Sequence, residues 1–464
     1  MSAGGRHHAP EKRPAERAAH IDLILRAAVA AADPAGPVRA AIAGDTAIRG
    51  ARRVFVLAVG KAARGMAHAG LDALPRRPDV ALIVVPHDAP GDAADTVDGI
   101  HVLSAAHPLP DEASVAAAEQ VMVLLEDATD GDVVVVLISG GASALCTAPA
   151  GTITIREYAA IVHALLIAGA DIRELNTVRA HIDRLKGGGM ARLADPARVL
   201  GLIVSDVVGS PLHVIASGPL SRVRTSTADA VHVLERYGLW ADAPDTVRRV
   251  LTRKGEAAVR DVEPDFAHVT LRVIADNHTA VAGAADVARS LGYDVRVATE
   301  PVTGPAREAG LRIAHAAIDV AGSLRPGDRP VCLLTGGETT VVVTGPGLGG
   351  RNQELVLAGA IALRGIPGIT VASLGTDGVD GPTDAAGAIA DGDSVARAES
   401  AGLDAALALD HNDSYAFFTR AGGHIVTGPT GTNVIDVQVA LVDAPSNTSV
   451  NTSGSGSRSV IEER

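Results

Sequence analysis

The sequence has very little lysine. Only four of its 464 residues are lysines, Lys12, Lys61, Lys186 and Lys254, so arginine supplies nearly all of the positive charge. Because arginine serves wherever this chain merely needs a cation, a lysine kept at a glycine-rich turn is informative. Lys61 and Lys186 both occupy such turns, and we single them out as candidate ligand contacts.

The sequence is also poor in cysteine and has no long apolar run. Cys146 and Cys332 lie far apart and match neither a disulfide framework nor a Cys/His metal motif. Both stand in apolar surroundings, so we expect buried thiols. No stretch has the unbroken apolar length of a membrane span, and the N-terminus lacks the apolar core of a signal peptide. We therefore expect a cytoplasmic protein with no membrane partner.

Positive charge is in deficit overall. The formal net charge is −13 and the pI is about 5.6. A nucleic-acid partner requires a basic face, so this balance argues against one. It does not argue against a small phosphorylated substrate, because a single site can still be locally cationic.

Apolar strands alternate with helical patterns along the chain. Residues 53–59, 132–138 and 199–204 are continuous apolar runs that predict buried strands. The order predicts an α/β fold. A first helix is expected at residues 20–43, and the strand at residues 269–275 is expected to open a second half.

Glycine is concentrated in one stretch, residues 333–357. Paired glycines predict a turn at residues 335–337, which puts the carboxylate of Glu338 where the chain reverses. A β-branched strand is expected at residues 339–344. The loop that follows opens a helix at Arg351, and such a loop presents free N–H groups and a cation to an anion. The alternative is a tight connection with Arg351 as a solvated charge.

Two further turns follow strands in the first half. Lys61 stands between the strand at residues 53–59 and a helix, a position where open α/β sheets bind ligands. Its surroundings match neither GxGxxG nor the GxxxxGK[ST] loop, and a solvent-facing helix start is the alternative. The strand at residues 132–138 is followed by hydroxyls and bare amides that also indicate an anion site, at Ser139, Gly140, Gly141 and Ser143. A serine elbow, GxSxG, is not matched, and a plain glycine-rich turn is the alternative.

Three more positions carry charge at turns. Lys186 is a candidate phosphate or carboxylate contact, although a helix-terminal lysine before a glycine cap would look the same. Asp206 follows the strand at residues 199–204, as a Mg²⁺ ligand does in phosphoryl-transfer sites, but it could also cap a turn. Asp377 lies in a loop of glycines and carboxylates that is capable of holding a metal, with a solvated turn as the alternative.

Together these turns combine cations, open amides and carboxylates. Phosphoryl transfer needs this mixture, because cations and amides stabilise the moving phosphate while carboxylates hold Mg²⁺. It also needs no strong protein nucleophile.

The order of the motifs resembles the glycerate 2-kinase family with its C-terminal MOFRL domain. The motifs are VGKAARGMA, HPLPDE, LISGGASAL, NTVRAHIDRLKGGGMA, SDVVGSPLHVIASGP, LLTGGETTVVV, GRNQEL, GTDGVDGPTDAAGA and GTNVIDV. The likeness runs from about residue 21 to residue 442.

The resemblance implies a kinase that uses ATP and Mg²⁺ to convert D-glycerate into 2-phosphoglycerate. It implies an N-terminal Rossmann-like parallel sheet, a C-terminal mixed-sheet α/β domain, and an active site in the cleft between them. On this basis we expect a flexible segment at residues 1–18, domains at residues 19–255 and 256–443, and a disordered tail at residues 444–464. The protein would be a monomer or a homodimer.

The resemblance also assigns roles to residues. Lys61 and Arg351 would be the catalytic cations, one from each half. Asp206 and Asp377 would hold the metal. Glu338 and Asn433 also fall on positions that the family relies on and would contact substrate or nucleotide. From the glycine-rich turns themselves we expect the same of Ser139, Gly140, Gly141, Ser143 and Lys186. The family more often has serine where this chain has Asp183, which leaves a hydrogen bond near Lys186 open.

Two other functions compete with the kinase. One is an NAD(P)H-dependent hydroxypyruvate reductase, a label that members of this family also carry. The sequence speaks against it, because no strand is followed by GxGxxG with a suitable acidic residue downstream. The other is a sensor that binds a sugar acid or a nucleotide without turnover.

Overall fold

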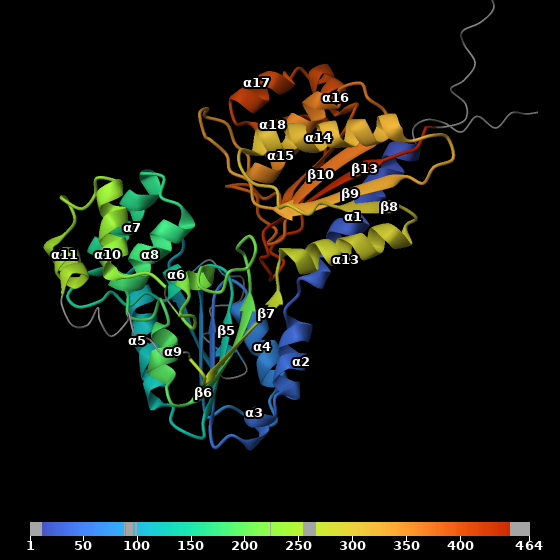
Figure 1. Ribbon diagram of the computed structural model, residues 1–464. Coiled ribbons are helices and arrows are strands. Elements are labelled where there is room, and N and C mark those ends of the chain that lie inside the picture. Colours follow the sequence, from blue (N-terminus) through green and yellow to red (C-terminus); the bar gives the residue numbers. More distant parts are fainter. Residues whose placement is uncertain are drawn as a thin grey trace, which may run out of the picture.

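The computed structural model describes residues 12–87, 89, 96–97, 100–222, 224–253 and 266–445. Within them the chain forms two lobes, each built on its own β-sheet with helices on both faces (Figure 1). This confirms the predicted α/β class, with a parallel sheet first and a mixed sheet second. None of the described helices combines the length and the apolar character that crossing a membrane requires.

The first sheet has seven strands in the described part of the chain, and all of them except β3 run parallel. From edge to edge they are β3 (Thr96–Val97), β4 (Ile100–Ala105), β2 (Val80–Pro86), β1 (Val54–Val59), β5 (Val133–Ile138), β6 (Arg198–Val204) and β7 (Val269–Ala275). Counted along the chain, the parallel strands follow the Rossmann order 3-2-1-4-5-6. The order reverses between β1 and β5, so the crevice for a ligand is expected at their carboxyl ends.

Both faces of this sheet are buried. Alternate residues of β1 enter two different apolar clusters, with Val56 and Ala58 in one and Phe55 and Leu57 in the other. Continuous burial of a central parallel strand explains its unbroken apolar sequence. The helices of the two faces are α2 (Ala35–Gly44) and α4 (Ala63–Ala73) on one side, with α3 (Thr46–Gly50) nearby, and α5 (Glu112–Asp127), α6 (Ala142–Leu145) and α9 (Gly189–Ala194) on the other.

Four more helices form a small bundle with a core of its own beside the first sheet, drawn in green in Figure 1. They are α7 (Ile155–Ile167), α8 (Ile172–Ile182), α10 (Thr227–Arg236) and α11 (Asp245–Thr252), and the short 3₁₀ helix η1 (Ile215–Ser217) lies next to α8 and α6.

The second sheet has six described strands, which pair antiparallel except for β8 with β9. In spatial order they are β12 (His424–Ile425), β11 (Gly387–Asp391), β10 (Ile369–Gly375), β13 (Asp436–Val442), β9 (Val331–Gly337) and β8 (Asp294–Val297). One face carries α1 (Lys12–Ala31) and α13 (Asn277–Ser290). The other carries α14 (Ala306–Ser323) and α15 (Arg351–Ala362), followed by α16 (Ser394–Ser400), α17 (Ala405–Asp410) and α18 (Ser414–Ala421).

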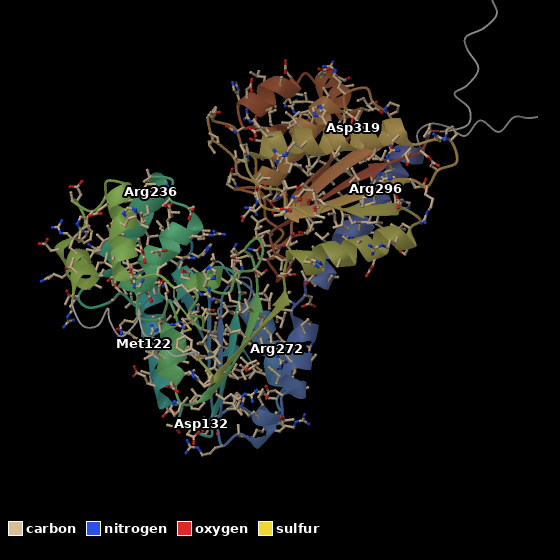
Figure 2. All side chains as sticks on the ribbon, viewed as in Figure 1. Met122, Asp132, Arg236, Arg272, Arg296 and Asp319 are labelled. Atoms are coloured by element: carbon tan, nitrogen blue, oxygen red, sulfur yellow. The ribbon has the colours of Figure 1, made fainter. Side chains whose placement is uncertain are left out.

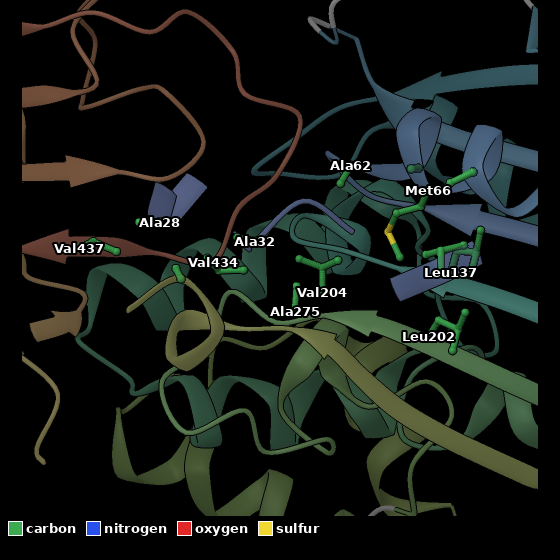
Figure 3. Packing of buried hydrophobic residues seen from close by; sticks show 14 of the residues in the cluster. Ala28, Ala32, Ala62, Met66, Leu137, Leu202, Val204, Ala275, Val434 and Val437 are labelled. Carbon is green, nitrogen blue, oxygen red and sulfur yellow. The ribbon is translucent and has the colours of Figure 1, made fainter. Parts of the chain in front are cut away.

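A single apolar cluster joins the two lobes. Ala28, Ala32 and Val434 from the second lobe and Val204 and Ala275 from the first all belong to it (Figure 3). The lobes are therefore packed on each other at the base of the site and are not linked by chain alone.

Charged side chains cover the outside of both lobes. Arg236 and Asp319 are examples in the two lobes (Figure 2). Asp132 lies at the end of the first sheet that is remote from the second lobe (Figure 2).

The N-terminal helix differs from its prediction. The helix expected at residues 20–43 is two helices, α1 and α2, because Pro34 cannot continue the backbone hydrogen bonds. α1 begins at Lys12, within the stretch expected to be flexible, and it packs on the second sheet. Arg17 secures it there, with Nη1 2.5 Å from Asp443 Oδ2 and Nε 2.7 Å from Thr370 Oγ1.

The strand expected to open the second half belongs to the first sheet. β7 pairs with β6 at the sheet edge, so this sheet continues beyond the boundary predicted at residue 255. α10 and α11 of the preceding segment pack against α8. The tail predicted to be disordered lies outside the described residues from residue 446 onward.

Two predictions within residues 333–357 are wrong. Residues 335–337 do not turn, because β9 continues through them and pairs Gly337 with Asp436 of β13. Residues 339–344 form no regular strand, and only Thr340 makes an isolated bridge, to Pro305. Val342 and Val343 are exposed, so this β-branched run lacks the packing partner that its propensity requires.

Candidate active site

Two predicted turns meet at the carboxyl ends of β1 and β5. The Lys61 amide donates to Gly140 O at 2.9 Å, and the Ala62 amide donates to Ser139 Oγ at 3.0 Å. The two turns are thus bonded directly to each other where the strand order reverses, as open α/β sheets arrange a ligand site. Among the described hydrogen bonds, none is made by the backbone N–H of Gly140, Gly141 or Ser143.

Gly140 brings residues of both lobes together. A side chain at this position would begin 2.3 Å from Asp206 Oδ2 and 3.5 Å from Asn433 Nδ2. Glycine is therefore required here by close approach and not by a positive φ. Asp206 follows β6 of the first sheet, while Asn433 precedes β13 of the second. The structure places two sequence-predicted residues from different lobes against one turn.

A direct polar contact also spans the lobes. Lys61 Nζ lies 3.3 Å from Asp377 Oδ2, and the two side chains are 37% and 22% exposed. Lys61 follows β1 and Asp377 follows β10, so the carboxyl ends of these two strands face one another. Both groups remain accessible enough to exchange this contact for one with a ligand.

Arg351, at the first position of α15, is held by two carboxylates. Its Nε and Nη2 donate to Asp436 at 2.7 and 2.9 Å, and its Nη1 lies 2.7 Å from Glu338 Oε1. Burial alone would lower the pKa of Arg351, but the hydrogen bonds and charge of Asp436 outweigh it and raise that pKa. The guanidinium is thus a permanent cation fixed in one orientation by a planar fork.

Asp206 is the carboxylate with the strongest need for a cation. It is half-buried, and burial raises its pKa to about 6, with the charges of Glu338 and Asp377 adding to the shift and Lys61 opposing it. These electrostatic couplings connect Asp206 to Lys61 and Asp377, and through Glu338 to Arg351. Within the described residues it forms no ion pair of its own.

The start of α15 does not offer free amides to an anion, contrary to the prediction. The amides of Asn352 and Gln353 donate to the buried carboxylate of Asp380, each at 2.9 Å. Asp380 also fills the space beside Gly350, which explains the glycine there. The guanidinium of Arg351 is therefore the group of this segment that we expect to contact a ligand.

Lys186 is buried in an ion pair. Its Nζ lies 2.6 Å from Asp183 Oδ2 and also donates to Cys146 O and Thr147 Oγ1. The burial of Lys186 lowers its pKa, but the charge of Asp183 outweighs this and raises it. Asp183 thus makes the shortest of these hydrogen bonds to Lys186. A direct contact between Lys186 and a ligand stays a prediction.

Ser143 belongs to a chain of polar groups. Its Oγ lies 2.7 Å from Ser217 Oγ, which donates to Asn176 Oδ1 at 2.8 Å. Ser217 and its neighbour Ala216 have φ near +60°, a strained conformation for residues other than glycine. Turns from both lobes and this strained segment of η1 therefore surround the same glycine-rich turn.

A cavity of about 580 Å³ opens between the lobes. It is lined by residues 207–210, which directly follow Asp206, by residues 276–278 and 297–301, and by Gly336 and Ile435. Its lining is largely apolar, so it suits the non-ionic part of a ligand whose charged part lies at the strand ends.

Asp436 and His107 are site residues that the sequence analysis missed or discounted. Asp436 is fully buried and orients Arg351. Its signal is weak, because it is a single aspartate at the start of an apolar strand. His107 lies against Gly141, where a side chain would begin 3.1 Å from its imidazole. The sequence shows it only as a loop histidine.

The residues fit a Mg²⁺ ion that is shared with a phosphate ligand. No three acidic, histidine or cysteine side chains of the described residues gather into a metal site. Mg²⁺ does not require this, because it is usually bound by one or two carboxylates together with substrate phosphates and water. The half-buried, unpaired carboxylate of Asp206, with Asp377 within electrostatic range, provides that minimal set.

Fold and geometry together define a two-lobed α/β protein in which Lys61 and carboxylates of both lobes lie at the switch point of a Rossmann-like sheet. The comparisons are more specific. Residues 20–252 match the family described as "Domain of unknown function (DUF4147)" and residues 331–436 match the MOFRL family. The chain belongs to the glycerate 2-kinase family that combines these two domains.

Individual relatives cover most of the chain. The D-glycerate 2-kinase of Thermotoga maritima is 38% identical over 390 residues, which are 84% of this chain and 91% of the relative. A protein of Agrobacterium vitis named putative hydroxypyruvate reductase is 38% identical over 423 residues, 90% of this chain and 93% of the relative. The crystal structure of a glycerate kinase from Thermotoga maritima superposes with a TM-score of 0.82 at 36% identity, covering 91% of this chain and 99% of that one.

Proposed function

We propose that this protein is an ATP- and Mg²⁺-dependent glycerate 2-kinase, which transfers the γ-phosphoryl group of ATP to D-glycerate and yields 2-phosphoglycerate. The observation that carries the proposal is the contact of Lys61 with a carboxylate of the second lobe, beside Asp206. Lys61 contacts Asp377 across the lobes, and Asp206 couples electrostatically both to Lys61 and to Glu338, the partner of Arg351. The names of the family members supply the substrate.

In this proposal the two cations share the charge of the transferred phosphoryl group. Lys61 approaches it from the first sheet and Arg351 from the second. Mg²⁺, held by Asp206 and Asp377, would neutralise the phosphates of the nucleotide. The open amides of Gly140, Gly141 and Ser143 bind phosphate oxygens, and Glu338 and Asn433 complete the wall of the second lobe. Such a site works by positioning and electrostatics and needs no covalent intermediate.

The structure gives no support to the reductase alternative. A dinucleotide-binding turn needs glycines and free amides at the start of the first crossover helix. Here Lys61 occupies that turn, and Ser139 Oγ already accepts a hydrogen bond from the Ala62 amide at the start of α4.

The experiment replaces each cation. We expect Lys61→Ala and Arg351→Ala each to lower kcat for glycerate phosphorylation by about 10³-fold, the effect of removing a transition-state cation in phosphoryl transfer. Arg312→Ala is the control, because Arg312 is exposed on α14, distant in sequence from every proposed contact. ADP release is followed with glycerate, NADH oxidation is followed with hydroxypyruvate, and phosphorus NMR identifies the product. Near-normal turnover in both variants, or NADH oxidation without ADP release, contradicts the proposal.

A further inference from the structure

The inner face of α8 carries three polar residues at helical spacing. Asn176, Arg179 and Asp183 are separated by three and four positions, so they lie on one side of the helix, extended at Asp183 by its C-terminal cap. None of the roles proposed above uses Arg179.

Both ends of this face touch the segment that follows the glycine-rich turn. Asn176 accepts a hydrogen bond from Ser217, which is bonded to Ser143. Asp183 Oδ2 accepts from the Ala148 amide at 3.2 Å. Arg179 lies between these two residues on α8, about one turn from each, so helical spacing puts it on the face that contacts the segment from Ser143 to Ala148.

Arg179 lacks a partner for its charge. Among the described residues it makes no hydrogen bond and no ion pair, although it is half-buried. Asp183 is the carboxylate whose charge acts on it, but Asp183 is already 2.6 Å from Lys186 Nζ. Two cations thus share one carboxylate in this cluster, and one positive charge is left over. Burial lowers the pKa of Arg179, which reflects that uncompensated cost.

The principal cations of the site are different, because each already has an acidic partner. Lys61 contacts Asp377, and Arg351 is bound to Asp436 and Glu338. A substrate acid brings one more negative charge, on a planar group. A guanidinium matches a planar carboxylate through two parallel hydrogen bonds, and an ammonium does not.

We propose that Arg179 binds the carboxylate of the acceptor substrate and thereby selects 2-hydroxy acids over neutral polyols. The inference rests on the proposed kinase function for the reaction that follows binding. Binding of a carboxylate by Arg179 does not itself depend on that function. Binding at Arg179 holds the carboxylate of the substrate beside Ser143. The hydroxyl groups of the substrate then face Lys61 and Arg351, the cations proposed to stabilise the transferred phosphoryl group.

The test varies glycerate and ATP separately in the full-length enzyme. For Arg179→Gln we expect KM for glycerate to rise at least about 10-fold, while KM for ATP stays within about 2-fold, because only a charged hydrogen bond to the acid is lost. Arg179→Lys keeps the charge without the planar fork, so its KM for glycerate should lie between those of the wild type and Arg179→Gln. Arg173→Gln is the matched control, because Arg173 is an exposed arginine on the same helix.

Discrimination between acid and amide gives a readout that a purely structural role would not move. The wild-type enzyme should prefer glycerate to glyceramide, and Arg179→Gln should lose most of that preference. Unchanged KM for glycerate in Arg179→Gln overturns the inference, and so does a larger rise in KM for ATP, which would assign Arg179 to the nucleotide.

Calorimetry separates this inference from the proposed function. If the wild type phosphorylates no glycerate, the kinase assignment fails, and binding of glycerate and lactate anions then decides the role of Arg179. Loss of that binding in Arg179→Gln, with retention in Arg173→Gln, supports the inference. Equal binding by wild type and Arg179→Gln, or no binding by the wild type, overturns it.

Discussion

At the residue scale, the charged side chains of the site are positioned by other charges. Arg351 is the clearest case, since its planar fork is bound by Asp436 while a second edge contacts Glu338. Asp436 is fully buried and Glu338 is 42% exposed, so the first sets the orientation and the second can move with a ligand. A permanent cation held in this way needs little reorganisation when charge develops beside it.

Replacing Asp436 tests this division of roles. We expect Asp436→Asn to lower kcat about 100-fold, because the loss of the charged fork lets Arg351 shift by about 1 Å. KM for glycerate should change less than kcat. Steady-state kinetics with both substrates varied measures the effect.

The control for this variant is Asp443→Asn, which removes another aspartate–arginine pair, that between Asp443 and Arg17, outside the site. It should leave kcat unchanged. A kcat for Asp436→Asn close to that of the wild type would mean that Arg351 does not depend on this partner.

At the scale of elements, the first sheet has a structural end and a functional end. The carboxyl ends of β1 and β5 carry Lys61 and the glycine-rich turn. At the opposite end, Asp132 has a fully buried side chain and accepts hydrogen bonds from Arg52 and Arg53 at 2.8–3.2 Å. These bonds connect the start of β1 with the start of β5. They hold the two strands whose turns form the site in register at the end of the sheet opposite to the site.

This arrangement predicts a pH-dependent stability. Burial by itself raises the pKa of Asp132, but the hydrogen bonds from Arg52 and Arg53 outweigh it and hold that pKa well below its usual range. A lowered pKa in the folded state stabilises the protein fully above about pH 4, and this stabilisation is lost progressively as pH falls from there towards the pKa of the folded state. We expect Asp132→Asn to lower the free energy of unfolding by about 2 kcal/mol at pH 7, and by less at pH 3.

Urea unfolding at both pH values, followed in the first lobe, measures this difference. Asp130→Asn is the control, because Asp130 is an exposed neighbour. The same difference between wild type and Asp132→Asn at pH 7 and pH 3 would show that ionisation of Asp132 does not stabilise the sheet.

At the scale of the whole molecule, α1, the first described helix, belongs to the lobe of the second sheet. α1 packs against α13, β10 and β13, and Thr432 Oγ1 donates to Ala32 O at 2.8 Å just after the helix ends. The N-terminal segment is thus part of the lobe that supplies Arg351, Asp377 and Asn433. Its apolar face continues into the cluster that joins the lobes.

Truncating one side chain of α1 should therefore destabilise the second lobe. Ile24 is completely buried, and we expect Ile24→Ala to cost about 3 kcal/mol. Leu23, its neighbour, is 49% exposed, so Leu23→Ala is the matched control and should cost little. Hydrogen exchange should show reduced protection in β10 and β13 and little change in β5. Equal loss in β5 would mean that the lobes unfold together.

The strands that the sequence predicted correctly follow from local patterns. Apolar runs predicted β1, β5 and β6, and the one or two residues that come after each run had to lie at the carboxyl end of its strand. Lys61, Ser139 and Asp206 were placed at strand ends in this way. The first helix, the turn at residues 335–337 and the strand at residues 339–344 were predicted wrongly, because tertiary packing there overrode local propensity.

The sequence by itself determined the α/β class, the buried cysteines and the positions of the chemical groups along the chain, because each depends on residues that are close in sequence. Only the tertiary structure decided that Asp436 orients Arg351, that Asp380 occupies the amides of α15, and that α1 completes the second sheet. These contacts join segments 28 to 400 residues apart. They form because burying one charge or one apolar face requires a partner, and local sequence does not specify which distant segment will supply it.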